Sequence, residues 1–336
     1  MTIFSAPAYD AHELVTFGRD EKTGLRAIIA VHSSALGPAV GGCRMFPYAS
    51  ETEALNDVLR LSRGMTYKSA LAGLPFGGGK SVIIGDPVGD KTAGLMKAMG
   101  DFVHSQGGRY VAAEDSGTGV EDIRHMAERT PFVSGLEDNE FGGDPSPSTA
   151  WGVFLAIRTA VRHRLGQDSV RGIRVALQGL GHVGFYLAKL LIGDGAEVVA
   201  CDLNQENLDR AVREVGVQPV APEDIISQQV DVFSPCAMGA VLNAASIEKL
   251  RAGIVAGAAN NQLATAQDGA NLQDRGILYC PDFLINAGGI IDVYHQQLGS
   301  GESVKRAHIK RIETTLAQVL QRADINHQQT NVIAED

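Results

Sequence analysis

One strand, loop and helix in the second half of the chain restrict its fold more than any other feature. Residues 173–177 predict a strand, GLGHVG at residues 179–184 matches GxGxxG, and residues 183–191 predict a helix. Residues 197–201 predict a second strand, and Asp202 follows it at close to the roughly 20-residue spacing of an acid that binds ribose hydroxyls. This order predicts a Rossmann-type parallel sheet.

The three glycines of this loop have different expected roles. Gly179 makes the turn, Gly181 lets the backbone approach a pyrophosphate, and Gly184 allows close helix packing. Asp202 would repel the extra phosphate of NADP, so the pattern favours NAD. A glycine-rich turn without a ligand is the alternative. The predicted cofactor contacts here are Gly179, Leu180, Gly181, His182, Val183, Gly184 and Asp202.

A second glycine-rich stretch, GMTYKSALAGLPFGGGKS at residues 64–81, places Lys68 and Lys80 in a run without an acidic residue. Because glycine permits positive φ and close approach, residues 77–79 are expected to form a tight turn from which Lys80 reaches a small anion. A surface turn with a solvated lysine is the alternative. The stretch also ends like a P-loop, but position 74, where that motif needs glycine, is leucine. A P-loop kinase or ATPase is therefore a minor alternative.

Two carboxylates follow a predicted strand at residues 109–113. Glu114 and Asp115 stand at the strand end, where α/β proteins place catalytic groups, although Asp115 is also a suitable helix N-cap. Upstream, Ser50 and Glu53 predict a capped helix that could carry Lys68 inward near its C-terminal end, where the helix dipole favours a cation. Leu55, Val58, Leu59 and Ser62 are expected on its apolar face.

Length and charge limit the possible partners. A chain of 336 residues predicts about two domains, and a net charge of −10 disfavours a nucleic-acid or anionic-membrane partner. The four cysteines are far apart and no metal-binding motif is present, so no metal is expected. The N-terminus does not resemble a signal peptide and no run is long and apolar enough to span a membrane, which favours the cytoplasm.

The sequence divides at FGGDPSPS, residues 141–148, a Gly/Pro/Ser-rich break. A long amphipathic helix is expected over residues 149–164. Strands at residues 230–233, 254–258 and 277–279 would extend the second sheet. The predicted fold class is therefore α/β with two domains: a substrate-binding and catalytic domain over residues 1–142 and a Rossmann-type domain over residues 143–317, with a cleft between them.

Taken together, the motifs resemble one family over nearly the whole chain. They are GGCR at residues 41–44, GMTYK ending at Lys68, GGGK ending at Lys80, AEDSGT at residues 113–118, GDPSPSTA at residues 143–150, the GxGxxG loop, NNQL and LINAGG. In this order they are similar to the glutamate/leucine/phenylalanine/valine dehydrogenases, and most of all to the leucine dehydrogenases.

The resemblance implies NAD-dependent, reversible oxidative deamination of an L-amino acid to its 2-oxo acid and ammonia. It assigns the substrate carboxylate to Lys68, activation of the water or amine to Lys80, and proton transfer to Asp115. It also places Thr149 and Ala237 at the cofactor and Asn261 at the junction of substrate and nicotinamide. By itself, Asn261 could equally belong to a polar turn.

This chemistry is consistent with the residue types. An amino-acid substrate needs a cation for its carboxylate, a base for the ammonium proton and an activated water. Lys80 can be that base only if its pKa falls well below ~10.4 through desolvation and the charge of Lys68, whereas Asp115 opposes that shift. A cleft that closes on the substrate is therefore expected.

The resemblance also gives a substrate pocket and an assembly. The pocket set is apolar and lacks a cation for a glutamate side chain, so leucine, valine and isoleucine are favoured. Tyr294 departs from the smaller residue expected there and keeps an aromatic substrate as an alternative. A homo-oligomer, with residues 318–336 packed back on the first domain, is expected, and a non-catalytic NAD-sensing regulator is the alternative class. The substrate-side residues are Val40, Gly42, Met65, Lys68, Ala113, Asn261, Ile291 and Tyr294.

Overall fold

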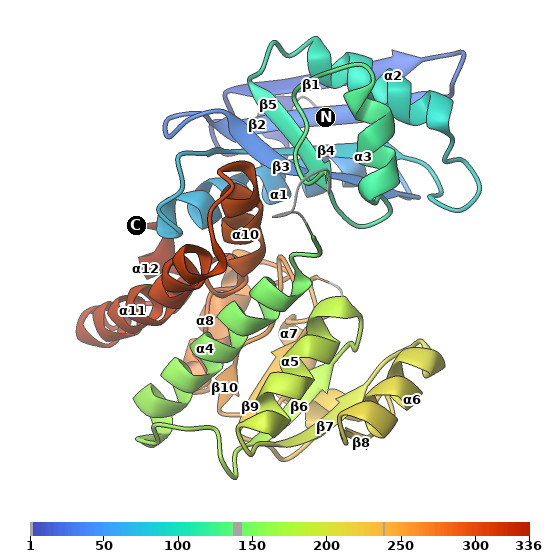
Figure 1. Ribbon diagram of the computed structural model, residues 1–336. Helices are drawn as coiled ribbons and strands as arrows, with labels where there is room; N and C mark the ends of the chain where they lie inside the picture. The colour runs from blue at the N-terminus through green and yellow to red at the C-terminus, as the bar shows by residue number, and fades with distance from the viewer. Residues whose placement is uncertain (1–2, 137–142, 238) are drawn as a thin grey trace. The chain divides into compact units, whose positions relative to one another are not determined.

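The computed structural model describes residues 3–136, 143–237 and 239–336, which form two compact units (Figure 1). The first contains residues 1–143 and 293–300, and the second contains residues 144–292 and 301–336. The main division is thus adjacent to the expected boundary after residue 142. Each unit has its own sheet and hydrophobic core, in agreement with the predicted two-domain α/β class.

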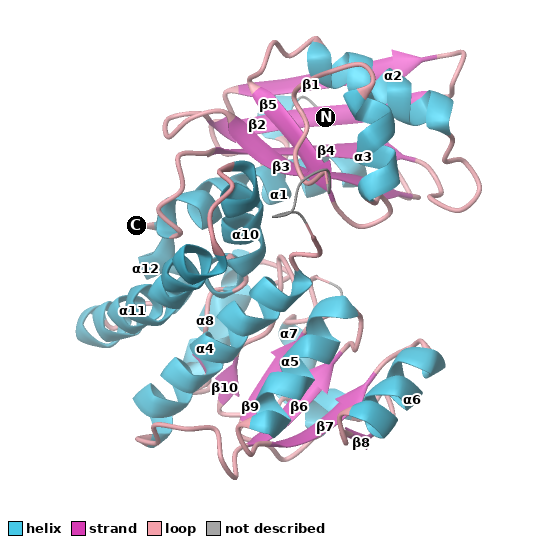
Figure 2. Cartoon of the chain, viewed as in Figure 1, coloured by secondary structure: helices cyan, strands magenta, loops and turns pink. Residues whose placement is uncertain are grey.

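The first unit is built on a mixed five-stranded sheet in the order β1-β2-β4-β3-β5 (Figure 2). The β1–β2 and β2–β4 pairs are antiparallel, whereas β3 pairs in parallel with both β4 and β5. A short 3₁₀ turn, Ile3–Ser5, precedes the sheet. The strands are β1 (Leu14–Asp20), β2 (Leu25–Ser33), β3 (Ala39–Phe46), β4 (Gly77–Ile84) and β5 (Tyr110–Glu114).

Helices cover both faces of this sheet because β2 alternates its side chains. Leu25, Ala27 and Ile29 join the core formed with α2 (Ala93–His104) and α3 (Val120–Ala127). Ile28 and Ala30 point the other way and join the core under α1 (Glu51–Leu71). The sheet therefore positions α1 on one face and leaves the other face to α2 and α3.

Helix α1 begins where the capping pattern predicts. Ser50 Oγ accepts from the Glu53 amide at 3.1 Å, and the Glu53 carboxylate accepts from the Ala49 amide at 2.9 Å. Of the expected apolar face, Val58, Leu59 and Ser62 are buried, and Leu55 is half-buried. Lys68 lies in the last turn, as expected.

The glycines before Lys80 do not form a tight turn, which corrects the sequence-based expectation. Gly77, Gly78 and Gly79 are the first three residues of β4 and are buried. A β-carbon at Gly78 would overlap the Thr66 backbone nitrogen on α1, and one at Gly79 would lie 2.7 Å from the Tyr110 ring. These glycines are needed because a helix and an aromatic ring pack directly on the strand.

The second unit has a six-stranded, all-parallel sheet in the order β11-β10-β9-β6-β7-β8. This confirms the predicted Rossmann-type sheet, with β9 two residues later than expected and β10 and β11 shorter. The strands are β6 (Arg174–Gln178), β7 (Glu197–Cys201), β8 (Gln218–Pro219), β9 (Val232–Pro235), β10 (Ile254–Val255) and β11 (Leu278–Tyr279).

The helices of this unit follow the strands, as in an alternating β/α fold. Helix α10 begins in the second unit, and its residues from Val293 belong to the first. The elements are α4 (Ser146–Leu165), α5 (His182–Gly193), α6 (Gln205–Glu214), a 3₁₀ turn (Ile225–Ser227), α7 (Ala244–Lys249), α8 (Ala266–Asp274), α9 (Asp282–Ile285), α10 (Gly288–Gln297), α11 (Glu302–Asn326) and α12 (Thr330–Glu335).

One expectation about a helix needs correction. Helix α4 is not amphipathic: it is buried over most of its length because α5 and α11 both pack on it. Residues 318–336 fall within the second unit, and their packing on the first domain stays a prediction. Buried Leu316 and Leu320 follow the helical period on α11, and the Thr330 hydroxyl donates to the Tyr279 carbonyl at 2.6 Å. Part of the predicted break, residues 141–142, lies outside the described residues.

Candidate functional site

The first candidate cluster joins Lys80 on β4 to Asp115 directly after β5. Lys80 Nζ lies 2.7 Å from Asp115 Oδ2, and the two side chains are only 6% and 15% exposed. Strand β3 runs between them, and a β-carbon at its Gly42 would lie 2.6 Å from Asp115 Cβ and 3.1 Å from Lys80 Nζ. Gly42 therefore leaves the space that this ion pair occupies.

Within this pair, the charge state of Asp115 is defined. Burial by itself would raise the pKa of Asp115, but the charges of Lys80 and Arg44 outweigh that effect and hold the pKa at about 2. Asp115 is therefore a carboxylate at neutral pH. It can orient a neighbouring ammonium group and accept a proton only when the positive charge beside it is lost.

Asp115 is not a helix N-cap, which removes that alternative. Helix α3 begins at Val120, and its N-cap is Gly119, whose amide donates to the Asp122 carboxylate at 2.9 Å. The Asp115 amide instead donates to Thr118 Oγ1 at 3.0 Å, and that hydroxyl donates to the Cys43 carbonyl at 2.7 Å. The turn after β5 is thus tied to β3, which fixes the direction of the Asp115 side chain.

Sequence reasoning missed the partner on the other side of Asp115. Arg44 Nε donates to the same Oδ2 atom at 3.0 Å, and Arg44 Nη1 lies 2.9 Å from Asp57 Oδ2 on α1. The available signal was the GGCR motif itself, because residues two apart in a strand share a face. Gly42 and Arg44 on β3 therefore point to the same side of the sheet.

Strand register brings the other substrate-side candidates of this unit to that face. Pairing of Val40 with Gly78 and of Cys43 with Ser81 sets Gly42 beside Lys80, and Gly42 pairs directly with Ala113. Because α1 packs on Gly78, its residues lie over the same face. Met65 and Lys68, one turn apart on α1, are both half-buried. The predicted residues Val40, Gly42, Met65, Lys68, Lys80, Ala113 and Asp115 are thus on one side of one unit.

The two pocket candidates on α10 are three residues apart on one helix, which passes from the second unit to the first between them. Tyr294 belongs to the first unit, where its ring meets Phe76 edge-on with a centroid distance of 5.4 Å. Phe76 directly precedes β4, so Tyr294 contacts the segment that leads to Lys80. Ile291 belongs to the second unit, where its amide donates to the Ala287 carbonyl at 3.1 Å.

The glycine-rich loop of the second unit has the geometry that its pattern predicts. Gly179 has a φ of +97°, and a β-carbon there would lie 2.8 Å from Ala237 Cβ. A β-carbon at Gly184 would overlap the Gly179 carbonyl, whereas one at Gly181 would meet no heavy atom of the described residues within 4 Å. Gly179 and Gly184 thus permit the turn and the helix packing, while Gly181 leaves an open side at the start of α5.

Asp202 lies beside this loop, at the end of the neighbouring strand β7. Its Oδ2 atom accepts from the Leu180 amide at 2.6 Å and its Oδ1 atom accepts from the Asn204 amide at 2.7 Å. Each carboxylate oxygen keeps a further lone pair for a hydroxyl donor. Of the other loop candidates, Leu180 is buried, Val183 is half-buried, and the His182 side chain is 78% exposed.

The remaining cofactor candidates lie elsewhere in the second unit. Thr149 is in the first turn of α4, where its hydroxyl donates to the Pro145 carbonyl at 3.1 Å. Asn261 has a φ of +50°, a conformation that asparagine tolerates, and its amide donates to Asp282 Oδ2 at 2.7 Å. The structure thus places Asn261 in a turn held by α9.

Asn286 of the LINAGG motif is a further polar residue that sequence reasoning did not assign. Its Nδ2 donates to the Ala258 carbonyl and to Asn260 Oδ1, both at 3.0 Å, so it belongs to the Asn261 segment. Its Oδ1 atom is buried and has no hydrogen-bond partner among the described residues. Because an orphaned buried acceptor is costly, this oxygen fits a ligand that donates a hydrogen bond, as a carboxamide does.

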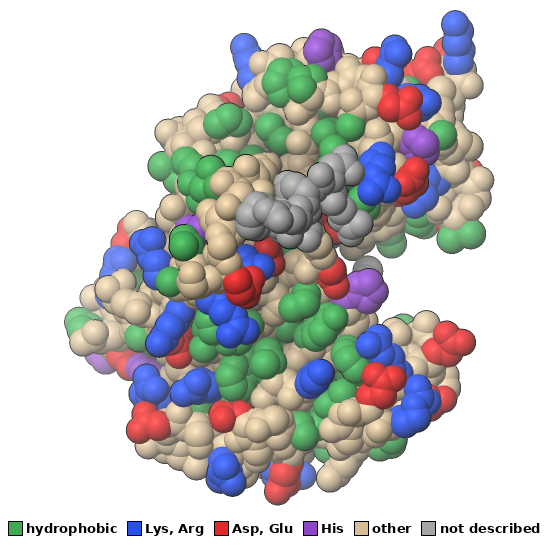
Figure 3. Space-filling model, in the orientation of Figure 1, with side chains coloured by type: hydrophobic (Ala, Val, Ile, Leu, Met, Phe, Trp, Pro, Cys, Tyr) green, Lys and Arg blue, Asp and Glu red, His purple; other side chains and the backbone are tan. Residues whose placement is uncertain are grey.

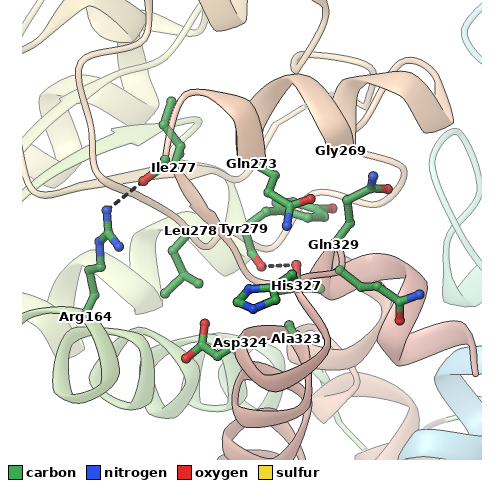
Figure 4. A pocket seen from close by; sticks show the side chains of 13 residues that line it. Arg164, Gly269, Gln273, Ile277, Leu278, Tyr279, Ala323, Asp324, His327 and Gln329 are labelled. Atoms are coloured by element: carbon green, nitrogen blue, oxygen red, sulfur yellow. Dashed lines mark hydrogen bonds between the residues drawn. The ribbon is translucent and has the colours of Figure 1, made fainter.

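Other features of the described residues do not suggest a different site. A cavity of about 410 Å³ in the second unit is lined by Arg164, Tyr279, Asp324 and His327 among others, and includes no candidate residue (Figure 4). No group of three or more His, Cys, Asp or Glu residues in the described ranges could hold a metal, and no described helix could cross a membrane. Acidic and basic side chains are interspersed on the face shown in Figure 3.

Comparisons with known proteins agree with the motif order. Residues 12–132 match the model described as the Glu/Leu/Phe/Val dehydrogenase dimerisation domain. Residues 144–205 and 202–329 match the model described as Glutamate/Leucine/Phenylalanine/Valine dehydrogenase. The two matches together cover most of the chain.

Three individual proteins show the range of similarity. A leucine dehydrogenase from Thermoactinomyces intermedius is 49% identical over 87% of this chain and 80% of its own length. A phenylalanine dehydrogenase from Bacillus thermotolerans is 44% identical over 94% of this chain and 84% of its own length. The crystal structure of L-tryptophan dehydrogenase from Nostoc punctiforme is 40% identical, with a TM-score of 0.79 over 96% of this chain and 93% of that one.

Proposed function

Because the chain belongs to the glutamate/leucine/phenylalanine/valine dehydrogenase family, we propose that it catalyses NAD-dependent, reversible oxidative deamination of a branched-chain L-amino acid. Family membership makes it an amino-acid dehydrogenase that uses a nicotinamide cofactor. The observation that carries the proposal is the buried Lys80–Asp115 pair at Gly42, on the sheet face that α1 and Lys68 cover.

In this proposal the first unit binds the amino acid and moves its protons. Lys68 holds the substrate carboxylate through its charge. Lys80, in its neutral form, takes the proton of the substrate ammonium and later activates the water that attacks the iminium carbon. Asp115, ionised beside it, orients Lys80 and can receive a proton as the charge at Lys80 changes. The expected product is the 2-oxo acid with release of ammonia.

The second unit is proposed to bind NAD. The start of α5 and the open side of Gly181 would receive the pyrophosphate, and Asp202 would accept hydrogen bonds from the ribose. Thr149, Asn261 and Asn286 are the proposed contacts on the nicotinamide side, and Ala237 supports the loop at Gly179. When bound, the nicotinamide supplies the acceptor for the substrate hydride. The carboxylate of Asp202 disfavours NADP through charge repulsion.

The choice of a branched-chain substrate depends on the side chains near Lys68 and Lys80. Val40, Met65 and Ala113 offer apolar surface and no charge for a substrate carboxylate, which argues against glutamate. Tyr294 at Phe76 favours the second candidate, an aromatic amino acid, because an aromatic pair can extend onto a third ring. Both substrate classes occur among the similar proteins, as the leucine and phenylalanine dehydrogenases.

Turnover with a panel of 2-oxo acids tests the function directly. NADH oxidation in the presence of ammonia should be fastest with branched 2-oxo acids and negligible with 2-oxoglutarate. Preference for aromatic 2-oxo acids would support the proposed reaction but change its substrate to an aromatic amino acid. NADH binding without turnover of any acid would contradict the proposal and favour a cofactor-sensing regulator.

The Lys80→Ala variant tests the proposed base. Loss of the amine should lower kcat for deamination at neutral pH by about 10²–10⁴-fold, the usual contribution of a general base. Lys97→Ala is the matched control, since Lys97 is on α2 of the same unit and its side chain is 40% exposed in a pair with Glu128. Near wild-type turnover in Lys80→Ala would contradict the assignment.

Assembly and location are further proposals. The model that matches residues 12–132 is described as a dimerisation domain, which supports a homo-oligomer. A single-chain mass in light scattering would argue against it. A cytoplasmic location stays a prediction from the sequence.

A further inference from the structure

We propose that Arg44 and Asp57 act as a positioning pair that tunes, through Asp115, the electrostatic field at Lys80 and so the pH profile of the reaction. The inference rests on the proposed function, because it assigns two further residues to the reaction of Lys80. In this proposal neither residue contacts the substrate. Both act through the electrostatic field at Lys80.

The first observation is that two cations share one carboxylate oxygen. Asp115 Oδ2 is 2.7 Å from Lys80 Nζ and 3.0 Å from Arg44 Nε. A second cation at the same oxygen repels the ammonium group of the lysine, because like charges disfavour one another at short range. Arg44 therefore weakens the hold of Asp115 on the Lys80 proton.

The second observation is that Arg44 is itself partly neutralised. Its Nη1 atom is 2.9 Å from Asp57 Oδ2, and the same oxygen accepts from the Tyr48 hydroxyl at 2.6 Å. Charges thus alternate from Lys80 through Asp115 and Arg44 to Asp57. The series ends at the neutral hydroxyl of Tyr48. Each step changes the field at the next, so removal of Arg44 and removal of Asp57 have opposite effects at Lys80.

Burial makes these charges effective. The Arg44 and Asp57 side chains are 19% and 24% exposed, whereas Arg26 and Glu51, an ion pair between β2 and the same helix, are 52% and 79% exposed. Exposed pairs are screened by water and contribute little, while shielded charges interact over several ångströms. The Arg26–Glu51 pair is therefore a matched control for the inner pair.

The other ionisable groups around the pair leave this relation intact. Cys43 of β3 and Tyr110 of β5 stay neutral because burial raises the pKa of each group, that of Cys43 to about 12. Asp122 of α3 is held at 2.8 Å by Lys91. Glu114 of β5 and Lys68 of α1 are present unchanged in every variant. The groups that differ between the variants are therefore Arg44 and Asp57 alone.

The test is the pH dependence of kcat/KM for amino-acid oxidation. In Arg44→Gln, Asp115 acts on Lys80 without competition, so the midpoint of the acid limb should move up by about one pH unit. In Asp57→Asn, the charge of Arg44 is no longer offset, so the midpoint should move down by about half a unit. Arg44→Lys, which keeps the charge, should stay within about half a unit of wild type. Arg26→Gln should leave the profile unchanged.

The outcomes separate a charge effect from a structural one. Opposite shifts in Arg44→Gln and Asp57→Asn support the proposal. Shifts of the same sign, or lower kcat at unchanged midpoints in both, would overturn it. If circular dichroism shows that Arg44→Gln does not fold, the other two variants decide. A midpoint that moves down in Asp57→Asn and stays near wild type in Arg44→Lys would support the proposal, and any other result would overturn it. Failure of the wild-type enzyme to turn over any substrate would reject the proposed function, whereas wild-type turnover with unmoved midpoints would reject only this pair.

Discussion

The two glycine-rich stretches of this protein use the same residue for opposite purposes. At Gly78 in β4, the space of the missing β-carbon is filled by the backbone of α1. At Gly181, before α5, that space is open. The first stretch lets a helix approach a strand, and in the proposed function the side chain of Lys80 does the chemistry there. The second leaves open space beside the backbone, where the proposed cofactor would bind. A glycine cluster therefore becomes informative only when its neighbours are known.

Gly78→Ala should give the largest effect, since the new β-carbon would overlap backbone atoms of Thr66 and Ser62 as well as the Thr66 hydroxyl. We expect a loss of about 3 kcal/mol or more in the free energy of unfolding, measured by urea denaturation, because helix α1 must shift away from β4. Gly119→Ala is the control in the same unit, as no described heavy atom lies within 4 Å of its β-carbon position. Equal stabilities of the two variants would contradict this account of β4.

The packing of α1 should also depend on pH. His32 Nδ1 lies 2.9 Å from Thr66 Oγ1, the residue that meets Gly78, and the His12 ring is 4.9 Å from the His32 ring. Burial lowers the pKa of both histidines, and the charge of His12 lowers that of His32 further.

The sign of this pH effect follows from proton binding. Below the unfolded pKa of about 6.5, the unfolded chain binds protons that the folded chain resists, so stability is full above that pH and falls as the pH drops through the lowered folded values. Partial screening should keep the slope below about 1 kcal/mol per pH unit for each histidine. Urea denaturation at several pH values should show a flatter dependence in His12→Gln/His32→Gln. An unchanged slope would show that other groups titrate.

Gly181→Ala should have the smallest effect on stability, below about 0.5 kcal/mol, because its backbone dihedrals suit alanine and its side is open. It should nevertheless weaken NADH binding by at least about tenfold, since the methyl group would occupy the approach of the pyrophosphate. Fluorescence titration of NADH measures this loss. Gly193→Ala, at the other end of α5, should bind NADH like the wild type. Unchanged affinity in Gly181→Ala would place the cofactor elsewhere.

The sequence by itself determined the features that depend on local chemistry. The Ser50 cap, the strand, loop and helix around Gly181, and the position of Asp202 follow from spacing within some 30 residues, the length of a βαβ unit. The sequence also predicts Lys80 and Asp115 as site residues, because the motifs that contain them occur in a recognisable order along the chain. Their contact at 2.7 Å could not be read from the sequence.

Only the tertiary structure decided which segments meet. The strand conformation of Gly77–Gly79 depends on α1 and Tyr110, and the burial of α4 depends on α5 and α11. The pairing of Arg44 with Asp115 and Asp57 joins a strand, a loop and a helix that no local pattern relates. Periodicity and capping act between neighbouring residues, whereas register and packing are set by the space that distant segments leave to one another, and that space exists only in the folded chain.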